Sequence, residues 1–191
     1  MRRNTPLVSD PSIVGVTVPA GSTGDNDKNP LYAVGNSAHA QVSAIYVAPP
    51  TALWGSASFL GELAWNRRTS ITKNPNALAA NSSRDAWAMR FIFEPTWFQA
   101  ASGLDLSAPI GLGYSAHGNS SVVGLFNAGG KEGGDLSVGI KGLYRQNWRF
   151  SLNFTHYFGP EGPVLNSLGQ YTFKQSLADR DFVSLSVQTA F

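Results

Sequence analysis

Cysteine is absent from this 191-residue sequence, and charged side chains are scarce. Without cysteine the chain can form no disulfide, no thiolate nucleophile and no cysteine-based zinc site. Charged residues make up 14% of the chain, whereas a typical soluble domain has about 25%. Aromatic residues at 12% and a formal net charge of only +2 exclude a disordered chain and give no support to a nucleic-acid partner.

Long hydrophobic runs are also missing. No stretch has the roughly 18 consecutive apolar residues of a transmembrane helix. The residues that follow Met1-Arg2-Arg3, up to Pro11, contain no apolar segment of the kind found in a secretory signal. We therefore expect either that the protein is not exported or that this chain is the C-terminal part of a longer exported protein. Residues 1–30 are predicted to form a long polar loop with a candidate short strand at 12–18.

What the sequence does contain, over residues 31–191, is alternation of period two. From Ala38 to Tyr46, for example, the even positions are apolar and the odd positions are mostly polar. This alternation is typical of a β-strand with one apolar and one polar face. The segments with this pattern are 38–46, 57–66, 87–94, 104–114, 136–145, 148–155 and 183–191. The sequence thus predicts an all-β protein with seven long strands and the short candidate as an eighth.

The connections between these segments alternate in length. Those at 49–52, 95–103 and 145–147 are short, and those at 67–83, 115–135 and 159–180 are long. An antiparallel up-and-down meander with one short-turn end and one long-loop end is how outer-membrane barrels are built. We therefore predict a transmembrane β-barrel. Because bacterial barrels have even strand numbers and cannot leave edges open in lipid, these 7–8 strands are expected to belong to a larger barrel.

Aromatic residues on the apolar face favour the same architecture. They gather near the two ends of the predicted strands, and aliphatic residues lie between them, as the two membrane interfaces require. The predicted girdle residues are Tyr46, Phe93, Tyr144 and Trp148 near the short turns, and Trp65, Trp87, Tyr114 and Phe158 near the long loops.

The opposite face carries charge, which an apolar core could not hold unpaired. We expect it to face a lumen, where the charges form a ladder of ion pairs that stiffens the wall; the alternative is a charged constriction that selects solutes. The lumen-facing candidates are Glu62, Arg90, Glu94, Asp105, Lys141, Arg145, Arg149 and Asn153.

The closing segment has a feature of its own. Apolar residues at Val183, Leu185 and Val187 lead to a terminal aromatic, Phe191, which is similar to the assembly signal of bacterial outer-membrane proteins. Thr189 departs from that pattern, because a hydrophobic or aromatic residue is usual there. We expect the final strand to engage the outer-membrane assembly machinery.

Three segments carry a family resemblance. Residues 177–191 (LADRDFVSLSVQTAF), together with 57–66 (ASFLGELAWN) and 148–157 (WRFSLNFTHY), resemble the domain of unknown function 1302 family of Gram-negative outer-membrane proteins. The family's members are longer than this chain, and the resemblance covers about residue 31 onward as a C-terminal part. It implies an outer-membrane location and a channel-like role in export or uptake of hydrophobic compounds, and it implies no catalytic residues.

The sequence contains no complete catalytic or metal-binding motif among those considered. The three histidines lack zinc-binding spacing, no Gly-x-Ser-x-Gly elbow occurs, and Glu132 stands where a P-loop needs Ser or Thr. The loop that opens at Asp25 resembles a calcium loop only in its first positions. We therefore expect no enzyme activity, no cofactor and no bound metal.

Three functions remain open. The first is the C-terminal portion of an outer-membrane channel or transport-associated barrel for small or hydrophobic compounds, with membrane lipid as its surroundings and an unidentified transport partner. The second is a small closed surface barrel with a structural or adhesive role through its long loops. The third is a soluble β-sandwich binding module.

Overall fold

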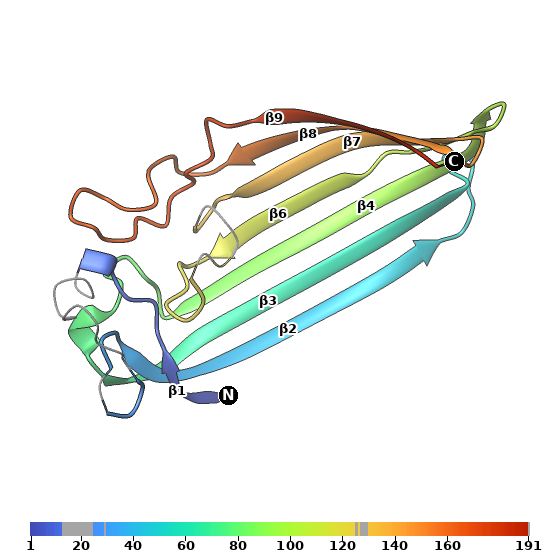
Figure 1. The fold of residues 1–191 in the computed structure, drawn as a ribbon. Coiled ribbons are helices and arrows are strands. Elements are labelled where there is room, and N and C mark those ends of the chain that lie inside the picture. The colour runs from blue at the N-terminus through green and yellow to red at the C-terminus, as the bar shows by residue number, and fades with distance from the viewer. Residues whose placement is uncertain (13–24, 29, 125, 127–129, 191) are drawn as a thin grey trace.

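The computed structural model describes residues 1–12, 25–28, 30–124, 126 and 130–190, and its elements form one antiparallel sheet (Figure 1). The strands are β1 (Arg2–Pro6), β2 (Val34–Ala48), β3 (Ser56–Lys73), β4 (Asp85–Ala101), β5 (Leu104–Ser107), β6 (Ile110–His117), β7 (Gly134–Tyr144), β8 (Trp148–Phe158) and β9 (Phe182–Thr189). A short 3-10 helix, η1 (Pro75–Ala77), lies between β3 and β4. The sheet order is β1-β2-β3-β4-β5-β7-β8-β9, and β6 also pairs with β4 and β7.

Strands β5 and β6 occupy one place in the sheet. Both lie between β4 and β7, and only Ala108 and Pro109 separate them. Hydrogen bonds continue through the gap, from the Ala108 N–H to the Pro95 carbonyl and from the Gly139 N–H to the Pro109 carbonyl. Pro109 has no N–H to donate, which explains why the strand is interrupted there. With β5 and β6 counted as one, the prediction of seven long strands in an up-and-down order is confirmed.

Several strands extend further than their apolar alternation indicates. β3 continues to Lys73 and β4 begins at Asp85, so the long connection expected at 67–83 contains only residues 74–84. The added residues are largely polar, yet they pair, with Arg67 opposite Asp85. β1 was not predicted, and it pairs with the beginning of β2. The candidate strand at 12–18 lies, except for Ser12, outside the described residues.

The connections alternate in the predicted way. Residues 49–55, 102–103 and 145–147 make the connections at one end of the sheet, and 74–84, 118–133 and 159–181 make them at the other. The long connections gather with the N-terminal segment at the left of Figure 1. Ser102 and Gly103 form a two-residue hairpin turn, in which Gly103 adopts a positive φ of 73°. The sheet thus has a long-loop end and a short-turn end.

Buried side chains concentrate at the long-loop end. A small core there contains Leu7, Ala33 and Ala77, packed against Ile71, Leu78 and Val122. Its members come from the N-terminal segment, from β3 and from two of the long connections. The loops themselves therefore supply the core of this molecule.

Both edges of the sheet are open in the described part of the chain. β1 covers only the beginning of β2, at Val34, Gly35 and Ser37. Beyond Ser37, no strand of the described residues pairs with the outer edge of β2, and none pairs with the outer edge of β9. No helix among the described residues has the length and apolar character needed to cross a membrane.

Candidate functional site

The register sorts the side chains onto two faces. Directly opposed residues of an antiparallel sheet project to the same side. One such row crosses all seven long strands, and every residue in it is apolar or aromatic. The row is Tyr46, Phe59, Phe93, Ile110, Val138, Phe154 and Val183. We call this side the apolar face and the other side the polar face.

The apolar face is exposed. On β9, Val183, Leu185 and Val187 are 66%, 73% and 62% exposed, and on β8 Leu152 is 47% exposed. Soluble monomers rarely expose contiguous apolar patches larger than a few hundred Å². An exposed apolar surface that spans seven strands is therefore unusual for a soluble monomer.

The predicted girdle aromatics lie along this face. Trp65 stands opposite Trp87, with ring centroids 6.2 Å apart, and Tyr114 stacks with Phe158 at 6.1 Å, both pairs towards the long loops. Tyr144 pairs with Trp148 beside a short turn. Tyr46 and Phe93 belong to the row described above. That row crosses β8 at Phe154, which is six residues along the strand from Trp148. Val183, Leu185 and Val187 lie on β9, and Phe191 falls outside the described residues.

Seven of the eight lumen-facing candidates lie on the strands of the polar face. The register connects Glu62 to Arg90 and, at the short-turn end, Asp105 through Leu143 to Arg149. The seven are Glu62, Arg90, Glu94, Asp105, Lys141, Arg149 and Asn153. Arg145 instead lies in the turn at 145–147, where its guanidinium carbon is 5.2 Å from the centre of the Tyr144 ring.

One ion pair crosses the polar face from β4 to β7. Arg90 Nη2 donates to Asp135 Oδ1 at 2.6 Å, and Gly113 of β6 lies between them in the register. A Cβ at Gly113 would lie 2.6 Å from Arg90 Nη2 and 2.7 Å from Asp135 Oδ1. The missing side chain of Gly113 therefore gives the two charges room to meet above the intervening strand.

A second ion pair makes the same crossing nearer the short turns. Lys141 Nζ lies 3.0 and 2.9 Å from the two carboxylate oxygens of Glu94, and Ser107 between them donates its hydroxyl to Glu94 Oε1 at 2.7 Å. The two pairs thus connect β4 to β7 on either side of the interruption at Pro109. Both are partly exposed, so each contributes no more than about 1 kcal/mol.

Sequence reasoning missed Asp135. It was assigned to the long connection 115–135, because the apolar alternation begins at Leu136. The structure places Asp135 within β7, on the face of Ser137 and Lys141. A signal was available, because Asp135 is two residues before Ser137 and therefore continues the odd-numbered positions that carry polar side chains in this strand.

The polar face also has an apolar part. Ile45 lies opposite Leu60, which lies opposite Ile92, on the side of Glu62 and Arg90. These residues, with Ala64 and Ala88, line a cavity of about 480 Å³. The polar face therefore offers apolar contacts beside charged ones.

At the long-loop end the polar face is covered. Asn66, Ala86 and Ser115 are buried there. The first part of the connection 118–133 lies over them, because Ser120 Oγ donates to Asn66 Oδ1 at 2.6 Å and Arg68 Nε donates to Ser121 Oγ at 3.1 Å. We call this cover, formed by residues 7–10, 74–84, 118–124 and 169–175, the loop cap.

Asp10 ties the loop cap together. Its carboxylate is fully buried and accepts the backbone N–H of Ala80 at 2.8 Å and that of Tyr171 at 2.9 Å. Its own N–H donates to the Ala77 carbonyl. One side chain thereby joins the N-terminal segment to two connections that lie 70 and 161 residues away in sequence.

A carboxylate outside the strands anchors the last connection. Asp181 accepts hydrogen bonds from His156 Nδ1 at 2.7 Å and from the Tyr157 N–H at 3.1 Å. The hydrogen bond with His156, followed by that from Tyr157, lowers the pKa of the Asp181 carboxyl from its ordinary value. Within the described part of the chain no group of three His, Asp or Glu side chains could hold a metal ion.

Comparison with known proteins yields one match. The model of a protein family described as "Protein of unknown function (DUF1302)" matches residues 1–191. No curated protein and no solved structure matches the chain.

Proposed function

The chain belongs to this family of unknown function, DUF1302, and we propose that it forms part of the wall of an outer-membrane β-barrel that passes small or hydrophobic compounds. In this proposal the apolar face contacts lipid and the polar face lines the lumen. The short turns face the periplasm and the long loops face outward, as in known outer-membrane barrels.

The observation that carries the proposal is the exposed apolar row across all seven long strands, with charged residues directly behind it. In a soluble protein the apolar side of such a sheet would be covered by a second layer. Lipid supplies that cover in a membrane, and a hydrated lumen accommodates partly exposed ion pairs such as Arg90–Asp135.

The polar face supports a transport role. Its apolar part around Ile45, Leu60 and Ile92 offers contacts for hydrophobic solutes, and the neighbouring charges keep the surface hydrated. The loop cap covers this face at one end only, so a solute that crossed the lumen would have to pass the cap.

The open edges support membership of a larger barrel. In lipid each unsatisfied backbone group costs several kcal/mol, so the outer edges of β2 and β9 must both be paired. We propose that further strands complete the barrel, and that β9 is the strand that the outer-membrane assembly machinery engages.

One observation favours the surface-protein alternative. The long connections form a hydrogen-bonded cap with its own small core, which is a surface that an adhesive protein could present. The sandwich alternative requires two packed sheets, whereas all nine strands belong to one sheet.

The proposal is tested by reconstituting the complete barrel, which is this chain together with the further strands that pair with β2 and β9, into phospholipid vesicles loaded with a small dye. We expect the chain to float with the vesicles, to resist an alkaline wash, and to release the dye. Stable incorporation without release would favour the structural surface protein. A chain that stays in the aqueous fraction as a monodisperse species would contradict the membrane location.

A further inference from the structure

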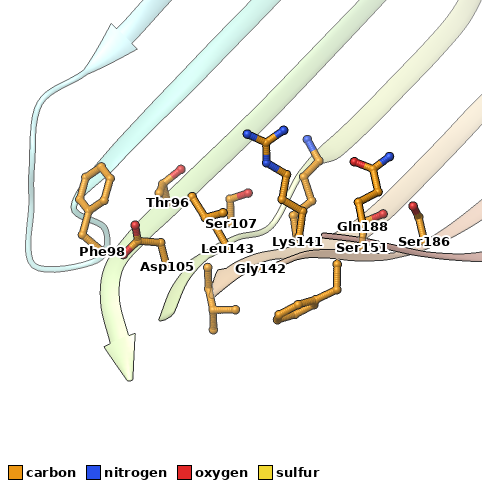
Figure 2. A pocket seen from close by; sticks show the side chains of 13 residues that line it. Thr96, Phe98, Asp105, Ser107, Lys141, Gly142, Leu143, Ser151, Ser186 and Gln188 are labelled. Atoms are coloured by element: carbon orange, nitrogen blue, oxygen red, sulfur yellow. The ribbon is translucent and has the colours of Figure 1, made fainter. Parts of the chain in front are cut away.

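A cavity lies on the polar face at the short-turn end, where the loop cap does not reach. Its volume is about 450 Å³, and it is lined from β4, β5, β7, β8 and β9. Figure 2 shows that Ser107, Lys141, Gln188 and Ser186 reach to the same side of the sheet. A volume in this range is that of a small-molecule site.

The charged side chains of this cavity differ in whether they have a partner. The ammonium of Lys141 is held by Glu94, and Asp105 accepts the backbone N–H of Gln99 at 2.8 Å. The guanidinium of Arg149, in contrast, is exposed and has no ion pair or side-chain hydrogen bond with any described residue. Leu143 stands between Asp105 and Arg149 in the register and keeps the two apart.

Donors and an apolar wall surround Arg149. Gln188 lies directly opposite it on β9, and Ser151 follows it on the same face of β8. Leu143 lies opposite it on the other side, and Phe98 closes the cavity from β4. A planar guanidinium binds a carboxylate through two parallel hydrogen bonds, and hydroxyl and amide groups can add further donors.

We propose that this cavity binds the carboxylate end of a small amphipathic organic acid. Arg149 receives the carboxylate, Gln188 and Ser151 donate to it, and the apolar body of the acid lies against Leu143 and Phe98. The inference rests on the proposed function in one respect, since the polar face must be in contact with water.

The site is tested by nuclear magnetic resonance titration of the ¹⁵N-labelled complete barrel, this chain together with the strands that pair with β2 and β9, in nonionic detergent micelles. The probes are benzoate, its neutral analogue benzyl alcohol, and inorganic phosphate. We expect benzoate to shift the Gln188 side-chain amide saturably, and the other two probes to bind at least about tenfold more weakly, because each lacks either the charge or the apolar body.

Variants assign the interaction to Arg149. Arg149→Gln should weaken benzoate binding by about tenfold or more, Arg149→Lys should weaken it less, and Arg145→Gln, which changes an arginine in the adjacent turn, should leave it unchanged. If Arg149→Gln does not fold, Gln188→Ala should still weaken binding several-fold.

Equal binding of benzoate to the wild-type chain and to Arg149→Gln would overturn the inference, and equal affinity for phosphate would overturn its organic-acid specificity. These outcomes are separate from failure of the proposed function, because micelle binding requires no transport. Failure of the chain to enter vesicles would count against the proposed function whatever the titration shows.

Discussion

The two ends of the polar face differ in how their polar groups are satisfied. At the long-loop end Asp10, Ser120 and the side-chain oxygen of Asn66 are buried and hydrogen-bonded, and contacts from the loop cap hold them. At the short-turn end Lys141 is half exposed, and the guanidinium of Arg149 has no partner among the described residues. One end of the face is thus built into the fold, and the other is left accessible to solvent and solutes.

The difference follows from the lengths of the connections. A turn of two or three residues, such as 102–103 or 145–147, cannot fold back over the sheet. Connections of 11 or more residues, such as 74–84, can, and they supply the acceptors and small apolar side chains that close the polar face. Connection length therefore decides which end of the sheet is covered.

The largest effect is expected from a substitution that disrupts the loop cap. Asp10→Ala removes the acceptor of two backbone N–H groups, and hydrogen bonds to a charged acceptor contribute about 1.5–3 kcal/mol each. We expect the loop cap to lose about 3 kcal/mol of local stability, so that the Ala80 and Tyr171 amides exchange about a hundredfold faster.

The matched control for this variant is Asp179→Ala, which removes an exposed carboxylate from the last long connection. In this control the exchange rates of the Ala80 and Tyr171 amides should be unchanged. If Asp10→Ala also leaves the exchange of both amides unchanged, the carboxylate does not hold the loop cap together.

A smaller effect is expected from Gly113→Ala. The added methyl group would displace the Arg90–Asp135 ion pair and lower the free energy of unfolding by about 1 kcal/mol. The measurement is unfolding by urea of the protein held in detergent micelles. The same substitution made together with Arg90→Gln should cost almost nothing, because the pair is already absent.

The control glycine is Gly124, whose added methyl group would have no heavy atom within 4 Å. Gly124→Ala should leave the unfolding free energy unchanged. An equal cost of Gly113→Ala with and without Arg90 would instead indicate that the strand itself is strained.

Sequence alone was sufficient for the strands and insufficient for the cap. Alternation identified all seven long strands, because one face of each is largely apolar, with only single exceptions such as His156 of β8 and Thr189 of β9. It underestimated β3, whose last residues, from Arg67 to Lys73, are mostly polar and are held by pairing and by loop contacts. Asp10 gave no signal, because the two N–H groups that it binds lie far away in sequence.

The site was predicted in the same partial way. The alternation of apolar and polar positions placed Arg90, Glu94 and Lys141 on one face, because successive residues of a strand point to opposite faces. It could not say which charges meet, since Arg90 reaches across Gly113 to Asp135 on a strand that is not adjacent in the sheet. Such a contact depends on the size of the residue between the two partners.

The smallest effect concerns pH at the long-loop end. Because the pKa of Asp181 is lowered in the folded chain, its contribution is fully present above the ordinary aspartate value of about 3.9 and is lost as the pH falls through the lower folded value. We expect the Tyr157 amide to remain protected from exchange down to about pH 4 and to lose protection below it. Loss of protection already at pH 6 would show that the Asp181 carboxylate is not the anchor.

The central claim is that the apolar face contacts lipid while the polar face contacts water. Because the chain has no cysteine, single cysteines can be introduced in turn at Ser151, Leu152, Asn153 and Phe154 of β8 and spin-labelled in the complete barrel in lipid vesicles. We predict that labels at 152 and 154 collide with oxygen dissolved in lipid, and that labels at 151 and 153 collide with a water-soluble nickel complex. Equal access of the nickel complex to all four labels would contradict the account.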